Sequence, residues 1–226
     1  MNYIEVDTAT EAFDYWYPLL DSQNLNASSR DGGVKGEVIN AITVIKDPTR
    51  GIVQSDIRKM SMRYALGELM WYLSANNSLS AIQNYTKAWD RMSDDGKTVN
   101  SNYGWCIGKK FGFNQWTHVY NMLKNDPNSR QAVIHIKSAD SKPSKDVNCT
   151  VCIQFLVREG KLHATVYMRS NDIWMGFPYD VFSFTAMQCL MAMELGLKIG
   201  TYTHIAGSLH LYERNGSVEE STNKAV

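Results

Sequence analysis

The sequence predicts one α+β domain in which helices flank a mixed β-sheet. Its 226 residues are enough for one ordinary domain with a sizeable core, so we assign residues 1–226 to a single domain. Hydrophobic residues make up 44% of the chain and charged residues 20%, the balance of a globular protein. Segments with the period of a strand and segments with the spacing of a helix alternate without a regular βαβ rhythm, which favours α+β over α/β.

The first part of the chain is predicted to contain helices around one strand. Residues 10–26 have the pattern of a helix, and residues 38–46, VINAITVIK, alternate like a half-buried strand. Apolar residues at helical spacing predict a longer helix over residues 55–75, with Ser55 as its N-cap. Another helix is predicted near residues 78–90.

The middle of the chain is predicted to supply most of the sheet. A helix near residues 114–125 is followed by three strand-like segments, QAVIHIK (131–137), CTVCIQFLV (149–157) and KLHATVYM (161–168). The last two are separated only by the tight connection REG (158–160), which predicts that they form a hairpin.

The last part of the chain is predicted to contain a buried helix and a strand. Residues 181–195, VFSFTAMQCLMAMEL, are apolar on all sides and are followed by Gly196, a typical helix terminator. Residues 200–212 return to an extended pattern. The polar residues 213–226 are expected to form a loose tail.

The charge balance argues against polymeric nucleic acid and membranes as partners. Lysine and arginine together number 23, as do aspartate and glutamate, so there is no basic excess for a long nucleic-acid footprint. The N-terminus has no apolar core of the signal-peptide type, and no apolar run approaches the roughly 18 residues needed to span a bilayer. We therefore expect a cytoplasmic protein.

The four cysteines are too few for a disulfide scaffold in a chain of this length, so reduced thiols are expected. Cys149 and Cys152 form a C-x-x-C pair, but neither a second such pair nor an H-x-x-H follows. The full ligand spacing of a metal site is missing, and no metal is expected.

Six short motifs occur in a particular order along the chain. They are NSNYG (100–104), DPNSR (126–130), NCT (148–150), MRSND (168–172), GFPYD (176–180) and GSLHLY (207–212). In this order and spacing the chain resembles the thymidylate synthase superfamily, and most of all its deoxycytidylate (dCMP) 5-hydroxymethylase branch. The resemblance covers residues from about 15 to about 212 and implies a thymidylate synthase-like fold.

The resemblance implies that Cys149 is the nucleophile. The C5 atom of a pyrimidine is a poor nucleophile, and addition of a thiolate to C6 makes C5 enamine-like. The thiolate form needs a nearby cation, and Arg169 matches the family arginine that lies near both the thiol and the nucleotide phosphate. Taken alone, a cysteine at the start of a strand is more often a packing residue, and the other three cysteines match no family role.

The implied phosphate ligands are Arg169, Ser170, Arg30 and Arg130. A guanidinium fork suits phosphate oxygens because it donates two parallel hydrogen bonds. Arg130 matches an arginine that family members contribute across a dimer interface, so the resemblance implies a homodimer. Family members commonly have a second arginine after it, whereas this chain has Gln131, which removes one cation.

The implied readers of sugar and base are His210, Tyr212 and Asp180. The first two match the pair that hydrogen-bonds the sugar 3′-hydroxyl. Asp180 stands where thymidylate synthases have asparagine, whose amide matches uracil; a carboxyl can accept from the N4 amino group of cytosine and, when protonated, donate to N3. An ordinary helix-capping aspartate is the alternative. Thr150 after the nucleophile, where synthases usually have histidine, also resembles the hydroxymethylases.

Glu68 and Tyr103 are the implied proton-transfer residues. Glu68 lies in GELMW (67–71), where apolar neighbours would bury its carboxyl and raise its pKa, as acid–base catalysis requires. The alternative is a surface glutamate on an amphipathic helix. Tyr103 matches a family tyrosine near C5.

The implied co-substrate is 5,10-methylenetetrahydrofolate. Trp89, Asp172, Gly176 and Tyr179 match its pterin and aminobenzoyl contacts, and an aromatic wall with one carboxylate suits a pterin. Synthases often have a second tryptophan after the first, where this chain has Met92.

These residues leave several activities open. The expected one is hydroxymethylation of dCMP, in which water rather than hydride reaches the new carbon, as in enzymes that bacteriophages use to make modified DNA precursors. The short segment after Tyr212 agrees with a reduced lid that admits water, and closure of the site by another segment is the alternative. The alternatives are a thymidylate synthase or dUMP hydroxymethylase, a CMP hydroxymethylase, and an inactive family member that binds nucleotide or RNA.

Overall fold

The fold is a single domain built on one twisted, mixed sheet. The computed structural model describes residues 2–25, 27–29, 31–139 and 144–217. Within them the sheet has eight strands, and its main path runs in the order β1-β3-β8-β6-β5-β4, with β2 beside β3 and β7 beside β8. The strands are β1 Tyr3–Val6, β2 Ala27–Ser29, β3 Gly32–Ile45, β4 Val133–His135, β5 Thr150–Arg158, β6 Lys161–Met168, β7 Asn171–Asp172 and β8 Lys198–Tyr212. Helices and strands are thus mixed as the α+β class requires, and this prediction is confirmed.

Two long strands hold the sheet together in its centre. β8 pairs with β3 in antiparallel fashion on one side and with β6 in parallel on the other, so the sheet is mixed. β5 and β6 form the expected antiparallel hairpin, in which Arg158 pairs with Lys161. The two turn residues, Glu159 and Gly160, have φ values of 52° and 70°, the left-handed conformation that a tight hairpin turn requires.

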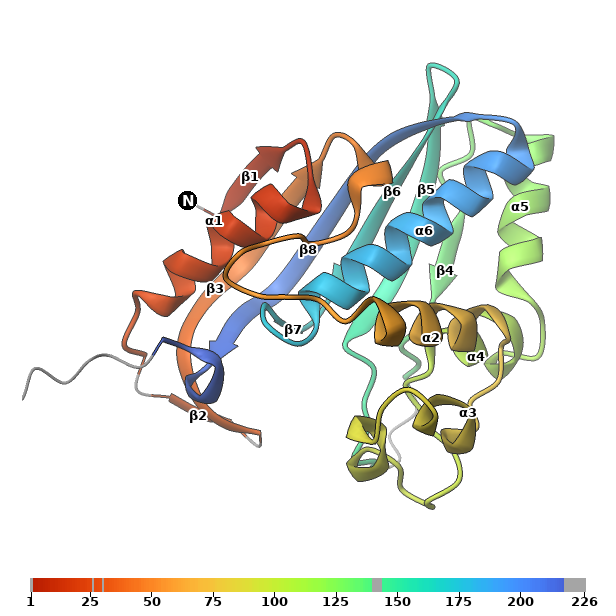
Figure 1. Ribbon diagram of the computed structural model, residues 1–226. Helices are drawn as coiled ribbons and strands as arrows, with labels where there is room; N and C mark the ends of the chain where they lie inside the picture. Colours follow the sequence, from red (N-terminus) through yellow and green to blue (C-terminus); the bar gives the residue numbers. More distant parts are fainter. Residues whose placement is uncertain (1, 26, 30, 140–143, 218–226) are drawn as a thin grey trace, which may run out of the picture.

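The helices cover one face of this sheet (Figure 1). They are α1 Ala9–Asp21, α2 Met62–Leu73, α3 Leu79–Gln83, α4 Tyr103–Trp105, α5 Gln115–Asn125 and α6 Phe177–Leu195. α6 crosses β6 and β8, and α1 packs on β3. On β6 and β8 the residues that face these helices are buried, while those that alternate with them are largely half-exposed. The face of the sheet away from α6 therefore remains partly open.

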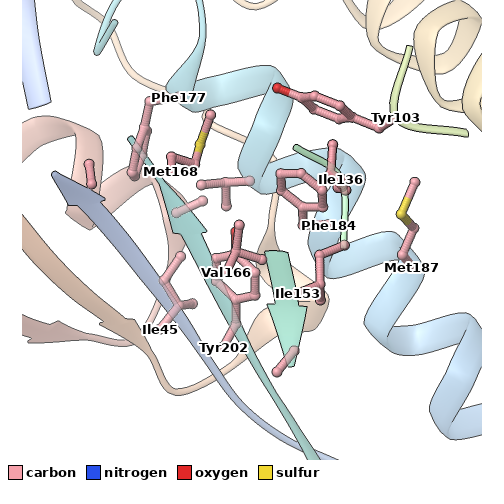
Figure 2. Packing of buried hydrophobic residues seen from close by; sticks show 14 of the residues in the cluster. Ile45, Tyr103, Ile136, Ile153, Val166, Met168, Phe177, Phe184, Met187 and Tyr202 are labelled. Atoms are coloured by element: carbon pink, nitrogen blue, oxygen red, sulfur yellow. The ribbon is translucent and has the colours of Figure 1, made fainter. Parts of the chain in front are cut away.

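The hydrophobic core lies between α6 and the sheet (Figure 2). Tyr202 of β8 lies among Ile45 and Val166 and is fully buried. At the edge of the same cluster the rings of Tyr103 and Phe184 stack, with centroids 5.4 Å apart. The hydroxyls of Tyr103 and Tyr202 are thus two polar groups within this apolar cluster.

The helix predicted over residues 55–75 is shorter than expected. It begins at Met62, and its N-cap is Ser61, whose hydroxyl accepts a hydrogen bond from the Tyr64 amide, so Ser55 as N-cap is wrong. The hydroxyl of Ser55 instead donates to Asp14 of α1. The apolar residues before residue 62 belong to an irregular segment that packs against the domain. Their spacing alone does not distinguish such a segment from a helix.

Three other helix predictions also had wrong boundaries. The helix predicted over residues 10–26 runs over Ala9–Asp21 and so ends five residues earlier than expected. The segment 78–90 is not one helix: it contains α3 and a separate 3₁₀ turn at Ala88–Arg91. The helix predicted over residues 181–195 begins four residues earlier, at Phe177, with Pro178 in its first turn. It ends as expected at Gly196, which has a φ of 67°.

The first residues after Tyr212 are held against the domain. Glu213–Asn215 form a 3₁₀ turn, the hydroxyl of Tyr17 donates to the carbonyl of Asn215, and Ser217 hydrogen-bonds Asp21. The expectation of a loose tail is therefore wrong for residues 213–217, and residues 218–226 lie outside the described part. In the part of the chain that the structure describes, no helix is both long and apolar enough to cross a membrane.

Candidate active site

Strand pairing brings Cys149 and Arg169 together at one end of the sheet. Cys149 immediately precedes β5 and Arg169 immediately follows β6, so the hairpin places them side by side, and the Arg169 amide donates to the Cys149 carbonyl at 2.8 Å. The guanidinium Nη2 lies 3.8 Å from the Cys149 Sγ. Its Nε donates to the carbonyl of Asn148, which holds the group in place. A fixed cation beside the half-buried sulfur stabilises a thiolate.

Glu68 is a buried carboxyl with a defined set of partners. It lies on α2 with 5% of its surface exposed, and the hydroxyl of Tyr64, one turn earlier, donates to its Oε1 at 2.7 Å. The indole of Trp89 in turn donates to the Tyr64 oxygen at 3.1 Å. Burial raises the pKa of Glu68 to about 7, against the hydrogen bonds of Tyr64 and Tyr72. The surface-glutamate alternative is therefore excluded, and this group can exchange a proton near neutral pH.

Asp180 is a second carboxyl with a strongly raised pKa. It lies in the first turn of α6, and its Oδ2 accepts a hydrogen bond from the Asn171 side-chain amide at 2.8 Å. Burial raises the pKa of Asp180 to about 8, the charge of Glu68 adds to this, and hydrogen bonds from Asn171 and Tyr103 oppose it. Asp180 does not cap its helix, because the N-cap position is Gly176.

Tyr103 joins these groups from the side of the core. Its ring lies between Tyr72 and Phe184, with centroid distances of 5.0 Å and 5.4 Å. Burial raises the pKa of Tyr103 well above its usual value, and the charges of Asp180 and Cys149 add to this. The phenol is therefore neutral and lies within electrostatic reach of the thiol and of both carboxyls.

His210 and Asp172 face each other across paired strands. They are register partners of β8 and β7, and the rings of His210 and Tyr212 are 4.9 Å apart. Burial lowers the pKa of His210, with Asp172 opposing, and raises the pKa of Asp172. The Asp172 Oδ1 accepts the amide of Trp174, which fixes its orientation.

An aromatic wall continues from Glu68 towards Asp172. The ring of Tyr179 meets that of Tyr64 edge to face at 4.6 Å, and the guanidinium of Arg58 lies over the rings of both Tyr179 and Trp174. Arg58 is 8% exposed, and among the described residues its Nη1 has no hydrogen-bond partner.

The structure does not join every predicted residue to this cluster. Arg130 lies in the loop before β4 with an exposed side chain, and its guanidinium pairs with no residue in the described ranges. Ser170 follows Arg169 and is half-buried. Arg30 lies outside the described residues.

Glycine 176 has a packing role that sequence reasoning missed. A Cβ atom there would lie 2.8 Å from the Asn171 Nδ2 and 3.2 Å from the Asp180 Oδ2. Any side chain at this position would therefore press on the hydrogen bond between those two residues.

Sequence reasoning also missed Arg58, Tyr64, Asn171, Tyr202 and His204. Tyr202 and His204 had a recognisable signal, since residues two apart on a strand share a face and this face is buried. Arg58 had none, because Trp174 and Tyr179 lie in a distant segment. Tyr64 had one, since it lies four residues before Glu68 on the same predicted helix, and Asn171 had one, since it stands inside the MRSND motif. Within the described ranges no three His, Cys, Asp or Glu side chains are grouped as metal ligands would be.

The comparison with known families agrees with this arrangement. Residues 30–224 match the family model described as thymidylate synthase. The chain therefore belongs to the thymidylate synthase family, whose members are transferases acting on C5 of a pyrimidine nucleotide.

Two solved structures share the fold. The thymidylate synthase of T4 phage has a TM-score of 0.75 and 22% sequence identity, over 90% of this chain and 76% of its own. The thermostable thymidylate synthase A of Bacillus subtilis has a TM-score of 0.75 and 24% identity, over 91% of this chain and 80% of its own. Together they confirm the thymidylate synthase-like fold that the motifs implied.

Proposed function

We propose that this transferase is a dCMP 5-hydroxymethylase, which uses 5,10-methylenetetrahydrofolate and water to make 5-hydroxymethyl-dCMP and tetrahydrofolate. The observation that carries the proposal is the Asp180 carboxyl, whose pKa of about 8 leaves it protonated near neutral pH. Cytosine presents an N4 amino donor beside an N3 acceptor, so its reader must offer one acceptor and one donor. A protonated carboxyl offers both, whereas an ionised one offers only acceptors.

The first chemical step follows from the position of Cys149. Its thiolate adds to C6 of the pyrimidine, and the electron pair of the C5–C6 bond moves to C5 and into the ring. Arg169, 3.8 Å from the sulfur, stabilises the thiolate before attack and the nucleotide phosphate throughout. The same arginine thus couples substrate binding to activation of the nucleophile.

The proton steps fall to Glu68 and Tyr103. The C5 proton has to leave after C5 forms its new carbon–carbon bond, and a neutral phenol beside Asp180 and Cys149 can pass it on. Glu68, with a pKa of about 7, can hold or release a proton at neutral pH and can orient a water molecule. Loss of the C5 proton breaks the bond between the new carbon and the folate nitrogen, so that tetrahydrofolate leaves and an exocyclic methylene remains on C5. Water that adds to this methylene gives a hydroxymethyl group, and elimination of Cys149 restores the C5–C6 double bond.

The folate-binding residues fit an anionic, aromatic ligand. When bound, methylenetetrahydrofolate supplies one carbon at the oxidation level of formaldehyde. Tyr179 and Trp89 offer rings for stacking, and Asp172 offers a carboxyl to a pterin. The positive charge of Arg58, which lies over the Tyr179 ring, suits a carboxylate of the folate tail.

We also propose a homodimer in which Arg130 reaches the phosphate site of the partner subunit. The exposed, unpaired side chain of Arg130 in the described structure supports this. So does the partly open face of the sheet, where Tyr167 is 38% exposed and Ile39 55%. Arg30 completes the set of proposed phosphate ligands. The cytoplasmic location stays a prediction.

Tritium release tests the proposed reaction. The protein is incubated with methylenetetrahydrofolate and with dCMP, dUMP or CMP labelled with tritium at C5. Release should be fastest from dCMP, without the absorbance change that marks formation of dihydrofolate. Faster release from dUMP or CMP would refute the proposed substrate, dihydrofolate formation would indicate methylation, and no release from any of them would favour a binding protein.

Replacement of Asp180 tests how the base is read. Asp180→Asn should shift the ratio of kcat/KM for dCMP over dUMP towards dUMP by about tenfold or more, because a mismatched buried hydrogen bond costs about 1–3 kcal/mol. Asp14→Asn, which changes an aspartate on α1, is the matched control and should leave the ratio unchanged. An unchanged ratio in Asp180→Asn would mean that another group reads the base.

A further inference from the structure

The carboxyl of Asp180 cannot by itself distinguish cytosine from uracil. A carboxylic acid has one oxygen that donates and one that accepts, and the two can exchange roles when the proton moves. One arrangement fits the N3 and N4 groups of cytosine, and the other fits the N3–H and O4 groups of uracil. Selection of cytosine therefore needs a second group that fixes which oxygen carries the proton.

A chain of hydrogen bonds runs from Asp180 into the core. The Asn171 Nδ2 lies 2.8 Å from the Asp180 Oδ2, and the Asn171 Oδ1 lies 3.0 Å from the His204 Nε2. The other nitrogen of that ring, Nδ1, lies 2.9 Å from the hydroxyl oxygen of Tyr202. Three side chains from β7 and β8 thus connect the base-reading carboxyl to a phenol deep in the core (Figure 2 shows Tyr202).

The buried phenol sets the direction of this chain. The Tyr202 hydroxyl is fully buried, and among the described residues only His204 is within hydrogen-bonding distance of it. Its hydrogen is satisfied only if it donates to the Nδ1 of His204, because an unpaired buried donor is strongly unfavourable. His204 then carries its own hydrogen on Nε2 and donates to the Asn171 Oδ1, and Asn171 donates to the Asp180 Oδ2.

The surroundings of His204 keep the ring neutral and fixed. It is 1% exposed, and burial lowers its pKa to about 3. The ring of Phe177 meets it edge to face at 5.3 Å. Asn171 is 2% exposed, so neither it nor His204 can turn to water for another partner.

We propose that Tyr202, His204 and Asn171 are positioning residues that hold the Asp180 Oδ2 as an acceptor and leave its proton to Oδ1, and so select cytosine against uracil. Oδ2 then accepts from both Asn171 and the N4 amino group, one on each lone pair, while Oδ1 donates to N3. Tyr103 also hydrogen-bonds this carboxyl, but a hydroxyl can donate or accept and does not fix the direction. The inference rests on the proposed function, since it names the group that sets its substrate preference.

Binding of uracil would require every hydrogen bond from Tyr202 to Asp180 to reverse its direction. The Asp180 Oδ2 would have to donate to O4, so Asn171 could no longer donate to it without two hydrogens meeting. Turning the Asn171 amide would move the hydrogen of His204 to Nδ1 and leave the Tyr202 hydroxyl without an acceptor. The free-energy cost of this unpaired buried donor disfavours binding of uracil.

Tyr202→Phe removes this penalty without touching the substrate or Asp180. Without the hydroxyl, both directions leave one nitrogen of His204 unpaired, so the bias between them is lost. The ratio of kcat/KM for dCMP over dUMP, measured by tritium release, should fall by about tenfold, with most of the change in the dUMP reaction. The matched control is Tyr17→Phe, which deletes a hydroxyl that donates to the Asn215 carbonyl and should keep the wild-type ratio.

The results separate this inference from the proposed function. If the wild type prefers dCMP and Tyr202→Phe keeps its ratio, the positioning role is refuted and the proposed function stands. If the wild type prefers dUMP, both are refuted. A loss of stability with an unchanged ratio would show that the hydroxyl serves packing alone.

A measurement on the wild type covers the case in which Tyr202→Phe fails to fold. The ¹⁵N chemical shifts of His204, assigned by its loss in a His204→Gln sample or by through-bond correlation to its backbone, report which ring nitrogen carries the hydrogen. We expect a neutral ring with the hydrogen on Nε2 at neutral pH. A hydrogen on Nδ1, or a charged ring, would overturn the inference whatever the substrate preference.

Discussion

Replacing Glu68 with glutamine should make the stability of the protein less dependent on pH. Burial raises the pKa of Glu68 from 4.5 to about 7, so the folded state holds this proton more tightly than the unfolded chain does. The stability that the group contributes is fully present below about pH 4.5 and is lost as the pH rises to about 7. The shift of about 2.5 pH units corresponds to about 3 kcal/mol.

Denaturant unfolding at roughly pH 5 and roughly pH 8 measures this effect. Between these two values the wild type should lose about 2–3 kcal/mol more than Glu68→Gln does. The charge of Glu68 also raises the pKa of Asp180. Without that charge Asp180 adds less pH dependence, so the loss of stability in Glu68→Gln is reduced further and the difference between the two proteins does not shrink. Glu194→Gln changes an exposed glutamate and should follow the wild type. Parallel pH dependence of wild type and Glu68→Gln would refute a buried, neutral Glu68.

Three further variants test other parts of the site. Cys149→Ser should lower turnover by several orders of magnitude and retain nucleotide binding in calorimetry, since a hydroxyl does not ionise near neutral pH; retained turnover would remove Cys149 from the mechanism. Tyr64→Phe deletes a hydrogen bond that lowers the pKa of Glu68, so the corresponding limb of the pH–rate profile should move to higher pH, and a downward shift would contradict the assignment. Arg130→Ala should weaken nucleotide binding, and mixing it with Cys149→Ser should restore activity through one intact composite site; a mixture as inactive as its parts would argue against sharing.

Local sequence patterns were sufficient where one segment makes its own structure. The α5 helix and the β5–β6 hairpin were predicted from period and turn residues, and both formed as expected. Predictions became wrong where a distant segment competes for the same residues. Ser55 looked like an N-cap until Asp14 accepted its hydroxyl, and the break between α3 and the following 3₁₀ turn has no local signal.

The candidate site divides in a similar way. The motifs pointed to Cys149, Arg169 and Asp180 without coordinates, and the segment GELMW (67–71) pointed to Glu68, because each is contiguous in the chain. The motifs could not give the partners of these residues. Tyr64 lies one turn before Glu68 on α2, but Trp89 reaches the Tyr64 oxygen only after its segment folds against that helix. Arg58 is recognised only by its contacts with the rings of Trp174 and Tyr179.

The sequence by itself determined which chemical groups this protein has and in what order. Tertiary structure alone decided how those groups behave, because a pKa depends on burial by segments far apart in the chain and a hydrogen bond has a direction that only its neighbours set. Asp180 is an ordinary acid in the sequence. Buried in the first turn of α6, and held by Asn171 through His204 and Tyr202, it becomes a neutral carboxyl with one oxygen already committed.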